Sequence, residues 1–179
     1  MAGIRDFVFD ILKAAMWKTP VCAPDGFGTE EWGRVHSVLS IHGLAAFAYD
    51  AVAAMPDEVK PPKSVTMRFI SSVVAAEQNY AKLMEVDSRL NDLISDSGYK
   101  ALRLKGFALA SYYPKPSSRR FGDIDVYSPG KGDEIDAFFR SKGLEVDDSF
   151  YRHSHCRIKG ISIENHKCLL DLRGRKRLR

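Results

Sequence analysis

The sequence predicts an α+β protein in which a helical N-terminal region precedes an α/β-like core. Three observations support this class. Apolar residues recur every three or four positions through most of residues 1–97, which is the period of amphipathic helices. From residue 98 onward, short extended segments alternate with helical ones in the order β-α-β-α-β-β. The 179 residues, 45% of them hydrophobic, suffice for a real core without disulfide staples.

Four helices are expected in the first region. The first carries one apolar stripe, made of Ile4, Phe7, Val8, Ile11, Leu12 and Ala15. Thr29 is expected to cap a second helix, and an Ala-rich third helix covers residues 44–55. The longest helix runs from about Ser64 to Ser97, and Gly98 suits its end.

The second region, residues 98–172, is expected to hold four strands and two helices. In chain order these are a strand at 99–104, a helix at 105–112, a strand at 122–127, a helix at 133–142, and strands at 150–158 and 161–172. The Lys159-Gly160 pair between the last two strands predicts a hairpin.

Charge is concentrated at the C-terminus. The chain has 27 basic and 23 acidic residues and a formal charge of +4. Five of the basic residues lie within 173–179, a segment that we interpret as a basic tail, so the rest of the chain has 22 basic against 23 acidic residues. No stripe of Lys and Arg is interleaved with aromatic residues, and nucleic acid is therefore not the expected partner.

The cellular setting is expected to be the cytoplasm. The three cysteines, Cys22, Cys156 and Cys168, are an odd and small number, which argues against a secreted disulfide scaffold. No apolar run reaches 18 residues, so no membrane span is expected. Asp6 and Asp10 interrupt the apolar stretch that a signal peptide would need.

The strongest chemical signal is the Asp123-Ile-Asp125 segment. Residues two apart on a strand point to the same side, so both carboxylates project together. Two like charges this close favour a cation between them, and oxygen ligands suit Mg²⁺ or Mn²⁺. If the strand at 161–172 lies beside this one, it presents Glu164 as a third carboxylate.

A second signal lies at the Leu104-Lys105-Gly106 junction between a strand and a helix. A glycine at such a junction allows backbone N–H groups to approach a phosphate closely. Lys105, Arg119 and Arg120 are candidates to neutralise phosphate charge.

Together these motifs resemble the uncharacterised nucleotidyltransferase-like family of the DNA polymerase β-type superfamily. The resemblance rests on Leu-Lys-Gly at 104–106, Arg-Arg-Phe-Gly-Asp-Ile-Asp-Val at 119–126 and the Ile-Glu-x-His segment at 163–166. A weaker similarity covers Ile-His-Gly-Leu-Ala at 41–45, which resembles the helical region that precedes the core in such proteins. The resemblance implies a mixed-sheet nucleotidyltransferase fold over residues 98–172.

The resemblance also implies a site and a reaction. Asp123, Asp125 and Glu164 would bind two divalent metals, Mg²⁺ or Mn²⁺. Gly106 and Gly122 would lie at the nucleoside triphosphate together with the three basic residues named above. The expected reaction transfers NMP from the triphosphate to a hydroxyl acceptor and releases pyrophosphate.

Two alternatives remain open at this stage. The chain could instead be a catalytically weak relative that acts as a binding or regulatory protein, for example as a toxin–antitoxin partner. A structural zinc site is also conceivable, with ligands among His153, His155, Cys156, His166 and Cys168.

Overall fold

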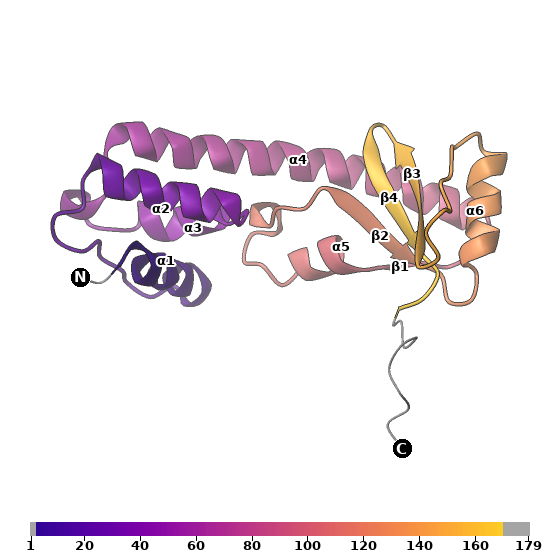
Figure 1. Ribbon diagram of the computed structural model, residues 1–179, viewed down its shortest axis with the longest axis horizontal. Coiled ribbons are helices and arrows are strands. Elements are labelled where there is room, and N and C mark those ends of the chain that lie inside the picture. Colours follow the sequence, from indigo (N-terminus) through magenta and orange to yellow (C-terminus); the bar gives the residue numbers. More distant parts are fainter. Residues whose placement is uncertain (1–2, 170–179) are drawn as a thin grey trace, which may run out of the picture. The chain divides into compact units, whose positions relative to one another are not determined.

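The computed structural model describes residues 3–169 and divides the chain into two compact units (Figure 1). The first unit consists of residues up to 81 together with 110–120. The second consists of 82–109 together with the chain from 121 onward. The helix α4 (Lys63–Asp96) contributes residues to both units.

The first unit is helical. It contains α1 (Ile4–Trp17), α2 (Thr29–Ile41), α3 (Ala45–Ala53), the short 3₁₀ helices η1 (Asp57–Val59) and η2 (Pro116–Ser118), and the first part of α4. Phe7, Val8 and Ile11 of the predicted α1 stripe are buried in its core, where Phe7 packs edge-on against Trp32. The predicted helical N-terminal region is confirmed.

The start of α2 differs from the prediction. Thr29 is the first helical residue, and Gly28 is the N-cap. The Gly28 N–H donates to Glu31 Oε2 at 3.0 Å. A carboxylate three residues into the helix thus takes the hydrogen bond that closes this end, and the Thr29 hydroxyl is not needed for it.

The second unit is built on a four-stranded mixed sheet. Its strands are β1 (Leu102–Arg103), β2 (Asp123–Tyr127), β3 (His153–Ile158) and β4 (Ile161–His166), in the spatial order β1-β2-β4-β3. β2 and β4 are parallel, and the other two pairs are antiparallel. With α5 (Lys105–Ala110) and α6 (Gly132–Ser141), the chain follows the predicted order β-α-β-α-β-β, which confirms the α+β class.

Several elements are shorter than predicted, because each strand extends only as far as its partner. The strand expected at 150–158 begins at His153, which pairs with the last residue of β4, His166. The first strand keeps only the two residues that pair with β2. The strand expected at 161–172 ends at residue 166, and residues 170–172 lie outside the described part of the chain, as does the basic tail.

The predicted hairpin between β3 and β4 is confirmed. Lys159 and Gly160 both have positive φ, 49° and 78°, which matches the two-residue turn that follows the twist of paired strands.

One face of the sheet forms the core of the second unit. Isoleucines and valines of β2 and β4 pack there with the second part of α4 and with α6, which lies beside the sheet in Figure 1. The buried set comprises Leu83, Val86, Leu90, Ile94, Ile124, Val126, Ile135, Phe139, Cys156, Ile158, Ile161 and Ile163. This packing leaves the other face of the sheet free for polar side chains.

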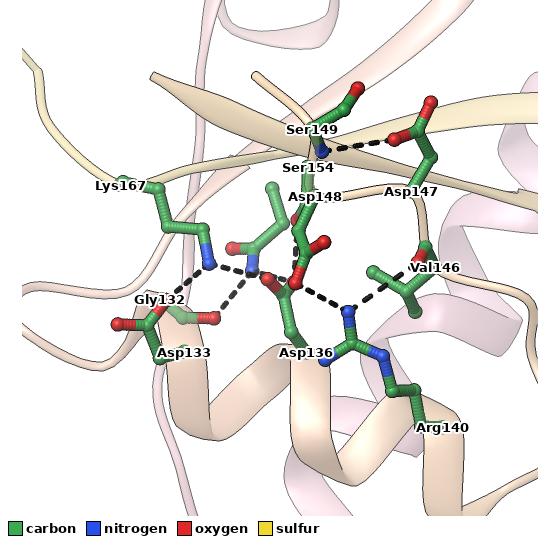
Figure 2. A network of polar contacts seen from close by, with 11 residues as sticks. Gly132, Asp133, Asp136, Arg140, Val146, Asp147, Asp148, Ser149, Ser154 and Lys167 are labelled. Carbon is green, nitrogen blue, oxygen red and sulfur yellow. Dashed lines mark hydrogen bonds and ion pairs between the residues drawn. The ribbon is translucent and has the colours of Figure 1, made fainter. Parts of the chain in front are cut away.

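A polar network within this core connects α6 to the sheet (Figure 2). Asp136 is 1% exposed, and its carboxylate accepts hydrogen bonds from Ser154, Asn165 and Lys167. Asn165 Nδ2 also donates to the Gly132 carbonyl at 2.8 Å. Both carboxylate oxygens of Asp136 are therefore satisfied, which is the condition for a buried charge to be tolerated.

No helix among residues 3–169 has the length and apolar composition needed to cross a membrane.

Candidate active site

Three strands present polar side chains on one face of the sheet. Asp125 of β2 lies beside Glu164 of β4, which in turn lies beside His155 of β3. Because side chains alternate between faces along a strand, Asp123 shares the face of Asp125, and His166 shares that of Glu164. The register thus gathers two aspartates, a glutamate and histidines over a few neighbouring positions.

Asp125 is the most buried member of this group, at 2% exposure. Its Oδ1 accepts a hydrogen bond from Lys105 Nζ at 2.7 Å and lies 2.9 Å from His166 Nε2. Burial raises the pKa of Asp125, but the hydrogen bonds from Lys105 and His166 outweigh it and hold the pKa below its usual value. The carboxylate is therefore ionised at neutral pH.

Lys105 is the counter-ion of this group. It is the first residue of α5, and its φ of 37° is a left-handed conformation that few residues other than glycine adopt. Its ammonium is also 3.5 Å from Glu164 Oε2, and 58% of its side chain is exposed. Burial lowers the pKa of Lys105, whereas the bonds to Asp125 and Glu164 raise it more. Lys105 is thus a charged residue that reaches the carboxylates from the solvent side.

Asp123 lies in a partly buried environment beside two other carboxylates. Its pKa is raised, first by burial and then by the charges of Asp125 and Glu164, and the Lys105 charge only partly opposes this. Three carboxylates face one ammonium here. This is the electrostatic situation that a divalent cation relieves.

The donor atoms fit a metal ion. One ligand atom each of Asp125, Glu164 and His166 lie within 4.8 Å of one another. The two carboxylates suit Mg²⁺ or Mn²⁺, and the imidazole favours Mn²⁺ of these two ions. His166 was named only as a possible ligand of the alternative zinc site, and it was not among the ligands predicted for Mg²⁺ or Mn²⁺. The signal that could have identified it is the two-residue spacing from Glu164 on the same strand.

The predicted metal ligands and Lys105 thus lie together. Asp123 lies close enough to feel the other two acids electrostatically, although it is not in the tight group of donor atoms. Lys105 was predicted to contact phosphate, and in the structure its ammonium contacts Asp125 instead.

The glycine at the start of α5 has a packing reason of its own. A Cβ on Gly106 would lie 2.6 Å from Cδ2 of Phe121, so the aromatic ring occupies the space that a side chain would need. Gly122, directly before β2, is exposed. The contacts of both glycines with a phosphate stay predictions.

The two predicted phosphate-binding arginines belong to the first unit. There the side chain of Arg120 lies against Gly43, in the turn between α2 and α3, and a Cβ on that glycine would be 3.2 Å from Arg120 Cβ. The roles of Arg119 and Arg120 at a phosphate stay predictions.

The structure does not support the alternative zinc site with cysteine ligands. Cys156 lies on the apolar face of β3, opposite His153 and His155, and burial together with the Asp136 charge raises its pKa to about 12. Cys168 lies beyond the end of β4. Because Cys156 faces the opposite side of the sheet from the two histidines, it cannot share a metal ion with them.

Comparison with known protein families identifies the chain's family. Residues 28–179 match the family described as uncharacterised nucleotidyltransferase, so the match includes the second unit, the first unit from residue 28 onward, and every residue of the site described above. No curated protein and no solved structure matches the chain. The match covers far more than half of the chain and supports a general nucleotidyltransferase role. The chain belongs to the uncharacterised nucleotidyltransferase family.

Proposed function

We propose that this protein is a metal-dependent nucleotidyltransferase that transfers NMP from a nucleoside triphosphate to a hydroxyl acceptor and releases pyrophosphate. One observation carries the proposal: the neighbouring parallel strands β2 and β4 bring Asp125 and Glu164 side by side, with Asp123 on the same face. Their charge exceeds what Lys105 neutralises.

Asp123, Asp125 and Glu164 would hold the divalent metal, and His166 would complete the donor set. A bound cation supplies neutralisation of the phosphate charge and polarisation of the bond that breaks. The remaining chemistry falls to the chain's own groups. Glu164, as the most accessible acid of the tight donor group at 18% exposure, is the candidate to accept the proton of the attacking hydroxyl.

Lys105 would change partners when the substrate binds. Its stem reaches in from solvent, so the ammonium can leave Asp125 without opening the core. A cation that takes its place among the carboxylates leaves the ammonium free to bind a triphosphate oxygen. This exchange joins the predicted role of Lys105 at phosphate with its observed contact to Asp125.

The test is binding followed by transfer. Thermal unfolding is measured with each of the four nucleoside triphosphates at millimolar Mg²⁺ or Mn²⁺, and transfer of α-labelled nucleotide is then followed in a lysate. The double variant Asp123→Asn/Asp125→Asn should lose both the shift in Tm and the transfer. Asp92→Asn, which removes an exposed acid of α4 in the same unit, should retain both. The absence of any triphosphate-dependent shift in the unmodified protein would refute the proposal.

A second candidate function is that of a catalytically weak binding or regulatory protein with the same fold. The observation that favours it is the ammonium of Lys105, which contacts both Asp125 and Glu164 and so neutralises part of the carboxylate charge from within the chain. A partner protein captured equally well by the unmodified chain and by the double Asp variant, with no nucleotide transfer, would support this function over the first.

A further inference from the structure

Two histidines of the outer strand β3 face the same side of the sheet as the carboxylates. His155 lies opposite Glu164 and His153 opposite His166 in the antiparallel pairing of β3 with β4. The rings of His153 and His155 are 4.6 Å apart between centroids, in an edge-to-face arrangement. The His153 ring also lies 5.3 Å, between centroids, from the ring of His166, so the pair adjoins the group formed by Asp125 and His166. The proposed transfer reaction does not use the pair.

Glu164 has one oxygen directed to each side. Its Oε2 lies 3.4 Å from His166 Nε2 and 3.5 Å from Lys105 Nζ. Its Oε1 lies 4.0 Å from His155 Nδ1. One carboxylate can therefore serve two neighbouring cation positions, one through each oxygen.

From this arrangement we propose a second metal site, formed by His153, His155 and the outer oxygen of Glu164, that binds a transition ion such as Zn²⁺ or Co²⁺. The three ligand atoms lie within 4.8 Å of one another. Ligand atoms around a tetrahedral zinc ion are separated by about 3.4 Å, given bond lengths of about 2.0–2.1 Å. Metal binding at this site therefore requires the three side chains to rotate toward one another.

The ligand set distinguishes this site from the one proposed for catalysis. Two imidazoles and one carboxylate suit Zn²⁺ and Co²⁺, whereas Mg²⁺ prefers oxygen ligands and holds its water tightly. Three protein ligands also leave a position open for water or another ligand. The side chains of His155 and Glu164 are 40% and 18% exposed, so an ion has access from solution.

Cobalt binding to the full-length, untagged chain tests the site. The visible absorption of bound Co²⁺ is followed during a titration in the presence of millimolar Mg²⁺. We expect His153→Asn/His155→Asn to weaken this binding by more than about 100-fold, because two of three ligands are lost. Asp123→Asn/Asp125→Asn should leave the cobalt spectrum in place, which separates this site from the catalytic proposal.

Two further variants complete the experiment. His42→Asn removes an exposed imidazole of the first unit and should not change cobalt binding. Where the double histidine variant does not fold, the single variant His155→Asn gives the same readout at a half-exposed position. Unchanged cobalt binding in the histidine variants, a loss in the double Asp variant, or no cobalt binding by the unmodified chain would overturn the proposal.

Discussion

The second unit contains two buried aspartates that each pair with a lysine, and they lie on opposite faces of the same sheet. Asp136, 1% exposed, bonds to Lys167, whose side chain is 19% exposed. Asp125, 2% exposed, bonds to Lys105, whose side chain is 58% exposed. Burial of the carboxylate is nearly the same in both pairs.

The surroundings of the two pairs differ. Asp136 also accepts hydrogen bonds from Ser154 and Asn165, so both of its oxygens have donors, and its lysine is only 19% exposed (Figure 2). Asp125 has the carboxylates of Glu164 and Asp123 beside it, and the pKa of Asp123 is raised. The single charge of Lys105 therefore leaves part of the negative charge uncompensated. A buried Asp–Lys pair is therefore structural where the carboxylate has donors on both oxygens. It is suited to bind a cation where further carboxylates lie beside it and its lysine is exposed.

The largest loss of stability is expected when the pair of Asp136 and Lys167 is broken. Asp136→Ala leaves Lys167, Ser154 and Asn165 without their common acceptor inside the core, at a cost of about 3–5 kcal/mol of unfolding free energy. Urea unfolding of the two proteins measures this. Asp133→Ala is the matched control, because Asp133 bonds to the same lysine but its side chain is 91% exposed. Its expected cost is below about 0.5 kcal/mol. A similar cost for both variants would contradict the comparison.

The lysines should differ in their response to metal. Lys105→Met and Lys167→Met each leave a buried carboxylate short of a donor, at a cost of roughly 1–3 kcal/mol. Millimolar Mn²⁺ should restore the Tm of the Lys105 variant, because a cation can replace the ammonium among three carboxylates. It should not restore the Tm of the Lys167 variant. If Mn²⁺ restored the Tm of both variants, or of neither, the two Asp–Lys pairs would not differ in their capacity to bind a cation.

The smallest effect is expected at Asp123. Its pKa is raised in the folded protein, so the fold binds this proton more tightly than the unfolded chain does. Stability contributed in this way is present at low pH and is lost as the pH rises through the folded-state pKa. Asp123→Asn should therefore be slightly more stable than the unmodified protein at pH 7, with the difference vanishing toward pH 4, as thermal unfolding against pH would measure.

The same substitution should act on metal binding in the opposite direction. Loss of one carboxylate is expected to lower Mn²⁺ affinity by more than about tenfold, as calorimetry would measure. If Asp123→Asn were less stable at pH 7, or bound Mn²⁺ with unchanged affinity, Asp123 would not share the electrostatic environment of Asp125 and Glu164.

Local patterns in the sequence predicted most of the fold. The three- and four-residue spacing over residues 4–15 identified α1, and the Lys159-Gly160 pair identified the hairpin, because both depend on neighbouring residues alone. Strand ends were less predictable, since pairing with a distant partner decides where a strand stops. The predicted cap of α2 was wrong for a related reason. Thr29 and Gly28 are both suitable N-cap residues, and the hydrogen bond from Gly28 N–H to the Glu31 side chain selects Gly28.

The sequence by itself determined which side chains share a face. Because side chains on a strand alternate with a two-residue period, Asp123 lies on the same face as Asp125, and Glu164 on the same face as His166, whatever the rest of the chain does. Only the tertiary structure decided that β4 lies parallel to β2 in the register that sets Glu164 beside Asp125. It also decided that Lys105 neutralises one aspartate and Lys167 another. These contacts join residues from 20 to 39 positions apart, and the free energy that selects them comes from burying the apolar face of the sheet, not from any local preference.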